Sequence, residues 1–155
     1  MAKPQPTSRA VQQTPHKTRD SPTLFDEGIE LFNRCEFYDC HEVLEEVWTP
    51  TRQPERWFLQ SLIHFAVGFY HHRKGNPKGA VRQLRKGIRK IEAYLPEWGG
   101  VRTAAIEQHA QRCLRVIEQG GQIEDFPKIE RCGPYCGHDY LVESAAQPQP
   151  TDRIL

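Results

Sequence analysis

The sequence predicts an all-α protein, a compact bundle of about five helices with disordered N- and C-terminal tails. Two observations carry this prediction. Apolar residues recur every three or four positions through the middle of the chain, and Gly and Pro mark the points where helices would begin or end. No segment shows the sustained apolar/polar alternation that strands require. Because the predicted loops are short, neighbouring helices should be mostly antiparallel.

The boundary signals define each helix in turn. The predicted helices run from about Ser21 to Arg34, about Tyr38 to Trp48, about Glu55 to Lys74, Pro77 to about Leu95, and about Val101 to Gln119. The clearest boundary is Gly75-Asn76-Pro77, which supplies a C-cap, an N-cap and a first helical residue. The third helix should be central, because apolar side chains cover about half its circumference or more.

Composition divides the chain into three parts. Residues 1–22 are rich in Pro, Thr and Ser and poor in large apolar residues, so we expect a disordered N-terminal tail. Residues 23–120 should form the helical bundle domain. We expect residues 121–155 to be a mostly irregular tail whose apolar residues pack loosely on the bundle.

The bulk properties argue against several classes of protein. The net charge of +1 gives no global attraction to nucleic acid or membrane, and no apolar run approaches the ~20 residues of a membrane span. The N-terminus lacks the apolar stretch of a signal peptide, and five cysteines form no even disulfide framework. We therefore expect a cytoplasmic protein that has no membrane partner and binds a small molecule or a protein. The overall charge does not favour nucleic acid, and a homo-oligomer remains open.

A polar face on the second helix is the most distinctive feature. His41, Glu45 and Trp48 follow one another at i, i+4 and i+7, so they share one side of the helix. Glu42 and Glu46 share a different side. This His-Glu-x-x-Glu sequence is weak evidence for a metal, because the zinc-protease signature has a second His where Glu45 stands.

The third helix carries a polar stripe of its own, formed by Gln60, His64 and His71. A buried His or Glu needs a hydrogen-bonding partner, so we expect the two polar stripes to meet. The result would be a pocket built from His41, Glu45, His64 and His71. Further candidates for its lining are Glu42, Trp48, Gln60 and Asn76.

Three interpretations of this pocket remain open. It is either a polar core that shapes a site for a small ligand or a protein partner, or a divalent metal site, or an acid–base pair. The metal ligands would be His41, Glu45 and His71, binding zinc, iron or manganese. The alternative enzyme, hydrolase-like, would use His41 and Glu45.

The outer face of the fourth helix gives a further alternative. Residues 82–90 contain five cations, Arg82, Arg85, Lys86, Arg89 and Lys90. They are either a solvated helix face or a contact for phosphate or RNA. No aromatic residue that could stack on bases lies among them.

Cys132, Cys136 and His138 resemble half of a zinc knuckle. The Cys-x3-Cys spacing lacks a second pair of ligands nearby, so an alternative is a tail without metal.

Taken together, the motifs resemble the bacterial and archaeal family called domain of unknown function 309. The matching segments are Glu27–Asn33, Phe37–Trp48, Gln60–Ile63 and His71–Ala80. The resemblance implies a compact helical bundle and no established activity.

Polar residues that match the family pattern are His41, Glu42, Glu45, Trp48, Gln60, His71 and Asn76. Two positions depart from it: Ser61 stands where Gly is usual, and His64 stands where Gln is usual. A metal site that needs His64 could therefore not be a function of the whole family.

Overall fold

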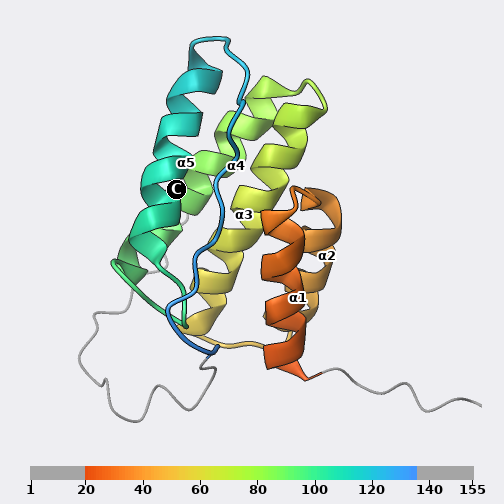
Figure 1. Cartoon of the computed structure of the whole chain (residues 1–155), viewed down its shortest axis with the longest axis vertical. Helices are drawn as coiled ribbons and strands as arrows, with labels where there is room; N and C mark the ends of the chain where they lie inside the picture. Colours follow the sequence, from red (N-terminus) through yellow and green to blue (C-terminus); the bar gives the residue numbers. More distant parts are fainter. Residues whose placement is uncertain (1–19, 136–155) are drawn as a thin grey trace, which may run out of the picture.

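The structure, a computed structural model, describes residues 20–135 (Figure 1). Its elements are α1 (Ser21–Asn33), α2 (Phe37–Trp48), α3 (Glu55–Arg73), α4 (Pro77–Ile91), the 3-10 turn η1 (Glu92–Tyr94) and α5 (Thr103–Glu118). The predicted all-α fold is confirmed. Extended backbone pairs only at isolated bridges within this part of the chain, and none of its helices has the length and apolar character needed to cross a bilayer. The predicted N-terminal tail lies almost wholly outside the described residues.

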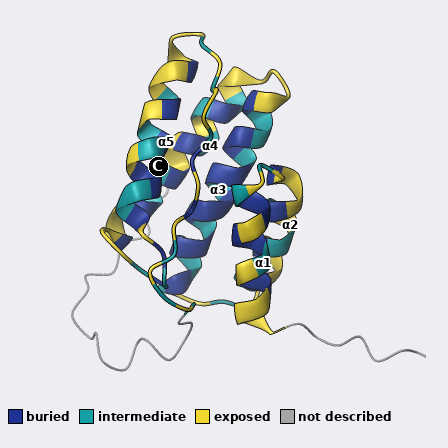
Figure 2. Ribbon diagram, in the orientation of Figure 1, coloured by how far each residue is buried: buried dark blue, intermediate teal, exposed yellow. Residues whose placement is uncertain are grey.

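The helices form a sequential array in which each one packs against the next. α1 contacts α2, α2 contacts α3, α3 contacts α4 and α4 contacts α5 (Figure 1). α3 is in the middle, and Figure 2 shows it as the most continuously buried helix. Its buried side chains include Phe58, Leu62, Phe65 and Phe69, each with no exposed surface.

The capping residues explain where the helices begin. The Asp20 carboxylate accepts a hydrogen bond of 3.0 Å from the Thr23 N–H at the start of α1. The Asn76 side chain accepts one of 3.0 Å from the Gly79 N–H at the start of α4, with Pro77 as the first helical residue. Gly75 precedes this cap with a φ of 73°, the left-handed conformation that glycine adopts without strain.

The fourth helix is shorter than predicted. Regular α-helix ends at Ile91 instead of Leu95, and η1 follows it. Pro96 disfavours a helical conformation at the residue before it, and the tighter turn places the Tyr94 ring beside Phe58 and within the core.

Two glycines allow α3 and α4 to approach closely. A Cβ atom at Gly68 would lie 2.8 Å from Leu84 Cδ2, and one at Gly87 would lie 2.7 Å from the Phe65 ring. Such distances are too short for real contacts, so side chains at these positions would force the helices apart. The close approach places the polar side chains of α4 within reach of α3.

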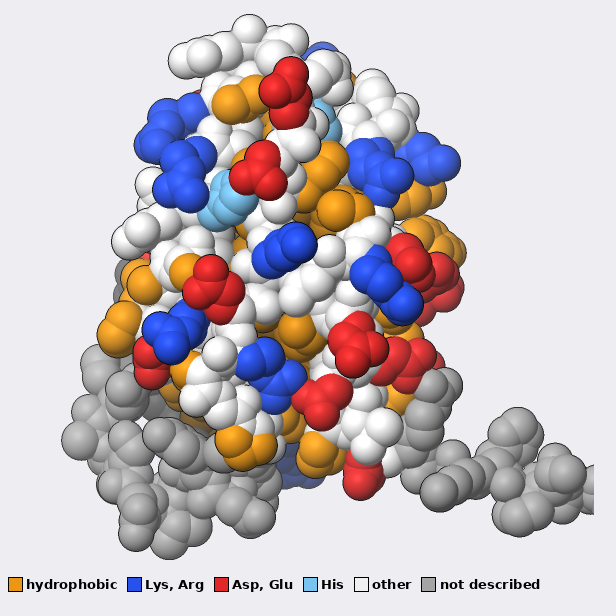
Figure 3. Space-filling view, viewed as in Figure 1, with side chains coloured by type: hydrophobic (Ala, Val, Ile, Leu, Met, Phe, Trp, Pro, Cys, Tyr) orange, Lys and Arg blue, Asp and Glu red, His pale blue; other side chains and the backbone are white. Residues whose placement is uncertain are grey.

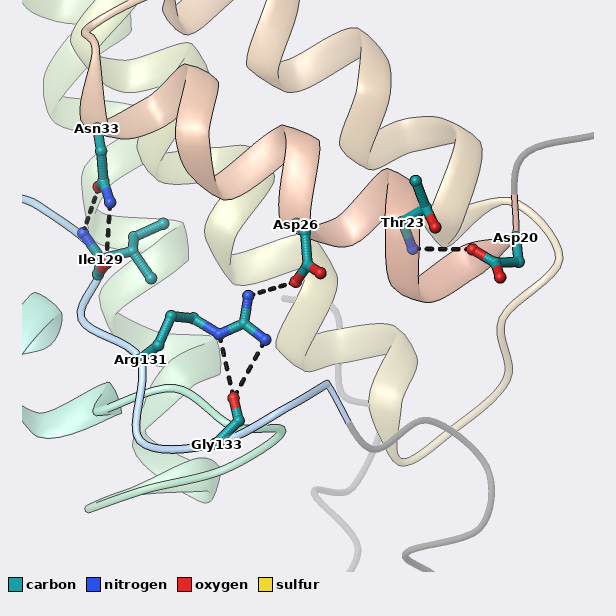
Figure 4. A network of polar contacts seen from close by, with 7 residues as sticks. All are labelled: Asp20, Thr23, Asp26, Asn33, Ile129, Arg131 and Gly133. Carbon is teal, nitrogen blue, oxygen red and sulfur yellow. Dashed lines mark hydrogen bonds and ion pairs between the residues drawn. The ribbon is translucent and has the colours of Figure 1, made fainter.

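An extended segment, residues 121–135, runs back from the end of α5 across the bundle to α1 (Figure 1). The Asn33 side chain accepts a hydrogen bond of 2.7 Å from the Ile129 N–H and donates one of 3.1 Å to its carbonyl, while Arg131 pairs with Asp26 (Figure 4). The expected loose packing is not observed, because Ile129 is only 2% exposed and Phe126 packs against aromatic rings of the core. On the face that carries this segment, acidic and basic side chains are interspersed (Figure 3).

The hydrogen bonds of Asn33 predict that its replacement by Ala lowers the stability of the protein markedly. Asn33→Ala should lower the free energy of unfolding by about 2 kcal/mol, because it leaves the N–H and carbonyl of Ile129 unpaired. The neighbouring Arg34 is exposed, so Arg34→Ala should change that free energy by less than about 0.5 kcal/mol. Urea unfolding of both variants measures the difference, and equal effects would mean that Asn33 does not anchor the segment.

Candidate functional site

A small cavity lies between the start of α2 and the end of α3, which are neighbours because the two helices are antiparallel. Its volume is about 190 Å³, and most of its lining is carbon. The lining residues are Phe37, Tyr38, His41, Val67, Tyr70 and His71. Two predicted site residues, His41 on α2 and His71 on α3, are thus brought together.

The orientation of His41 is set by its own helix. Its Nδ1 lies 2.8 Å from the Tyr38 carbonyl oxygen and must donate this hydrogen bond, because a carbonyl can only accept. Nε2 therefore lacks the proton in the neutral ring, and it lies 3.6 Å from Glu45 Oε1. The Glu45 side chain is 51% exposed, so this pair is at the surface beside the cavity.

An aromatic residue, Tyr38, and an acidic residue, Glu42, lie at the same end of α2 as His41. Tyr38 is 49% exposed, and its ring lies 5.1 Å from that of His41 and 5.4 Å from that of Tyr70. Glu42 raises the pKa of the Tyr38 hydroxyl through its negative charge and a side-chain hydrogen bond. Glu42 therefore contacts the exposed edge of the cavity without lining it.

Asn76 has a structural role beside the site. Its Oδ1 caps α4, and its Nδ2 lies 3.4 Å from His71 Nδ1. Asn76 thus contacts a lining residue but does not line the cavity.

Gln60 and His64 face α4 and belong to a separate polar network. Lys90 Nζ donates to Gln60 Oε1 at 2.7 Å and lies 3.1 Å from His64 Nε2. His64 Nδ1 lies 2.7 Å from Gln83 Oε1 and therefore donates to it. The lysine donates to Nε2, so the neutral ring satisfies both of its neighbours.

The predicted meeting of the two polar stripes is therefore realised at one end only. His71 meets His41, whereas Gln60 and His64 do not line the cavity. The physical reason is that the polar stripe of α3 lies between α2 and α4. Gln83 and Lys90 reach it from α4, and the sequence interpretation considered only α2 as a neighbour.

Trp48 lies at the opposite end of α2 from the cavity. The Arg56 guanidinium stacks on its ring at 3.8 Å and donates a hydrogen bond of 3.1 Å to its carbonyl. The Trp48 Nε1 is buried without a hydrogen-bond partner among residues 20–135. Trp48 therefore shares a helix face with His41 but belongs to the α2–α3 connection.

The geometry gives no added support to the metal hypotheses. In the described part of the chain, no group of three or more His, Cys, Asp or Glu side chains is placed to hold a metal ion. His41, Glu45 and His71, the metal ligands expected from the sequence, therefore do not form such a group. Of the zinc-knuckle residues, Cys132 is exposed, and Cys136 and His138 lie outside the described residues.

The network around His64 predicts a pH dependence. Burial, together with the charges of Lys90 and Lys86, lowers the pKa of His64 to about 4, although its hydrogen bond to Gln83 opposes the shift. The unfolded chain takes up this proton near its ordinary pKa of about 6.5. The folded protein therefore has the full stability that neutral His64 allows above about pH 6.5. Its free energy of unfolding decreases by about 2–3 kcal/mol as the pH falls towards 4.

His64→Gln removes this titrating group and keeps an amide that can pair with Gln83. The variant should lose less stability than the wild type between about pH 7 and about pH 4.5, as measured by urea unfolding at both pH values. His72, whose pKa burial also lowers, is present in both proteins and cancels in the comparison. Identical losses would show that His64 is not held neutral by the fold.

Comparison with known proteins finds similarity over the part of the chain that contains this site. The model of the family described as "Domain of unknown function (DUF309)" matches residues 25–83. "Uncharacterized protein YpuF" of Bacillus subtilis (strain 168) is 36% identical over 67 residues, which are 42% of this chain and 38% of that protein. An uncharacterized protein of Aquifex aeolicus (strain VF5) is 24% identical over 102 residues, which are 65% of this chain and 31% of that protein.

The matched regions thus span about a third of the length of these relatives. The family match runs from α1 into α4 and includes all residues that line the cavity, as well as His64 and Gln83. The resemblance to the domain of unknown function 309 family that the sequence motifs predicted is thus confirmed over residues 25–83.

Proposed function

We propose that this chain is a binding module whose site is the cavity between α2 and α3. The observation that carries the proposal is a hollow of about 190 Å³ with mostly carbon walls, open beside an exposed aromatic ring. Sites for whole drug-sized ligands are typically about 300–1,000 Å³. The cavity therefore suits one apolar or aromatic group of a larger partner, or a ligand of that size.

The exposure of Tyr38 supports a protein segment over an isolated small molecule. Tyr38 is 49% exposed next to the cavity, which leaves surface for contacts around an inserted side chain. Exposed tyrosines beside a pocket are typical of the anchor regions of protein interfaces. Glu42 and Glu45 at the edge would favour a partner with basic or hydrogen-bond-donating groups near its anchor.

The geometry supports the alternative of an acid–base enzyme less well. His41 and Glu45 could exchange a proton, but Glu45 is half-exposed and the pair lies at the surface. Acid–base groups act most strongly where water is excluded, and the excluded part of this site is lined by carbon.

A cavity-filling substitution tests the proposal. Titration of the full chain with p-cresol, followed by two-dimensional NMR, should shift the resonances of Val67 and Tyr70. Val67→Phe should weaken this binding at least about tenfold, because the larger ring occupies the cavity. Val116→Phe, the same change at an exposed position outside the cavity, should leave binding unchanged.

Two outcomes would contradict the proposed site: shifts that cluster away from Val67 and Tyr70, or p-cresol binding by Val67→Phe with unchanged affinity. Peptides with a central Phe or Leu then distinguish a protein partner from a small molecule, since a protein site should bind them more tightly than p-cresol.

A further inference from the structure

A second and larger depression lies between α4 and α5, away from the proposed cavity. This α4–α5 groove has a volume of about 660 Å³. Its lining residues are Pro77, Lys78, Val81, Arg82, Arg85, Lys86, Arg89, Ile117 and Glu118. Cations from one helix thus surround a short apolar surface, to which α5 contributes Ile117 and a single acidic group.

Within residues 20–135, most of the positive charge in the groove has no acidic partner. Lys78, Arg82, Lys86 and Arg89 are exposed, and none forms a hydrogen bond or ion pair with another described residue. Arg85 is the exception, since its Nη2 lies 2.6 Å from Glu118 Oε1. The net charge of the whole chain is only +1, so positive charge is concentrated here and balanced elsewhere.

The length of the charged row indicates the kind of ligand. Lys78 and Arg89 are separated by three turns of α4, which correspond to about 16 Å along the helix. About five phosphates of one strand span this distance along a duplex axis. A small phosphorylated molecule would contact only part of the row. Three of the five cations are arginines, whose planar guanidinium groups pair with phosphate oxygens through two hydrogen bonds.

We propose that the α4–α5 groove binds the phosphate backbone of a nucleic acid strand. No aromatic side chain lines the groove within the described residues, so binding would not involve base stacking and would be insensitive to sequence. The sequence analysis kept a phosphate or RNA contact of residues 82–90 as an alternative, although the overall charge of +1 and the lack of aromatic residues did not favour nucleic acid. The proposal is independent of the cavity between α2 and α3.

Fluorescence anisotropy of the full chain with labelled oligonucleotides of about 20 residues tests the proposal. Single-stranded RNA and DNA should bind with similar affinity, because only phosphates are contacted. A plot of the logarithm of the association constant against the logarithm of the salt concentration should have a slope of about −3 between about 50 and 200 mM salt.

Three variants should change the affinity for the oligonucleotide in three different ways. Arg82→Ala with Arg89→Ala should weaken binding about tenfold at low salt and reduce the slope by about 1.4. Glu118→Gln should tighten binding about two- to fivefold, because it removes the acidic group and frees Arg85; a misfolded variant would not produce this gain. Arg34→Ala with Arg52→Ala removes the same two charges from exposed positions outside the groove and should leave affinity unchanged.

Three results would overturn the proposal. The control pair could weaken binding as much as the groove pair, which would indicate attraction to charge in general. A poly-glutamate peptide could displace the oligonucleotide at equal charge concentration, which would indicate an acidic protein partner. Inorganic triphosphate could displace it at equal phosphate concentration, which would indicate a site for small anions.

Discussion

The burial of α3 is the constraint on which the rest of the structure depends. Neighbours cover most of its circumference, and its partly exposed polar side chains Gln60, His64 and His71 lie along the stripe between α2 and α4. Buried polar groups require partners, and α4 supplies them to His64 through Gln83 and Lys90. Towards the end of α3 the stripe meets Tyr38 and His41 of α2 instead, where the aromatic rings leave a cavity. One buried helix thus creates both a satisfied polar contact and an open site.

The extended segment after α5 completes this burial. The buried His72 on α3 accepts a hydrogen bond of 3.1 Å from the Ile123 N–H, and the Phe126 ring lies 5.6 Å from that of Phe69. These contacts tie the segment to the third helix of the array, while Asn33 ties it to the first. The family match ends at residue 83, so the second half of α4, α5 and this segment extend the structure beyond the matched domain. The α4–α5 groove crosses this boundary, with four of its nine lining residues inside the matched region and five beyond it.

Local signals in the sequence were sufficient to predict the helices but not their neighbours. The cap at Asn76 and Pro77 acts through adjacent residues, so its pattern identifies the start of α4 directly. Periodicity gives the angle of Gln60 and His64 around α3 but does not say which helix faces them, and both face α4. The burial of Ile129 depends on a residue 96 positions away, which no local pattern encodes. For the same reason, the groove became visible only when α5 was placed beside α4.

The division of the polar stripe into two independent parts is tested most directly by double-mutant cycles on the free energy of unfolding. His64→Ala and Gln83→Ala remove two groups in direct contact, so their effects should be non-additive by about 0.5–1.5 kcal/mol. His41→Ala and His64→Ala should be additive within about 0.3–0.5 kcal/mol, because one group lies beside the cavity and the other against α4. A coupling of more than about 1 kcal/mol between His41 and His64 would contradict this division and restore the single pocket that the sequence alone suggested.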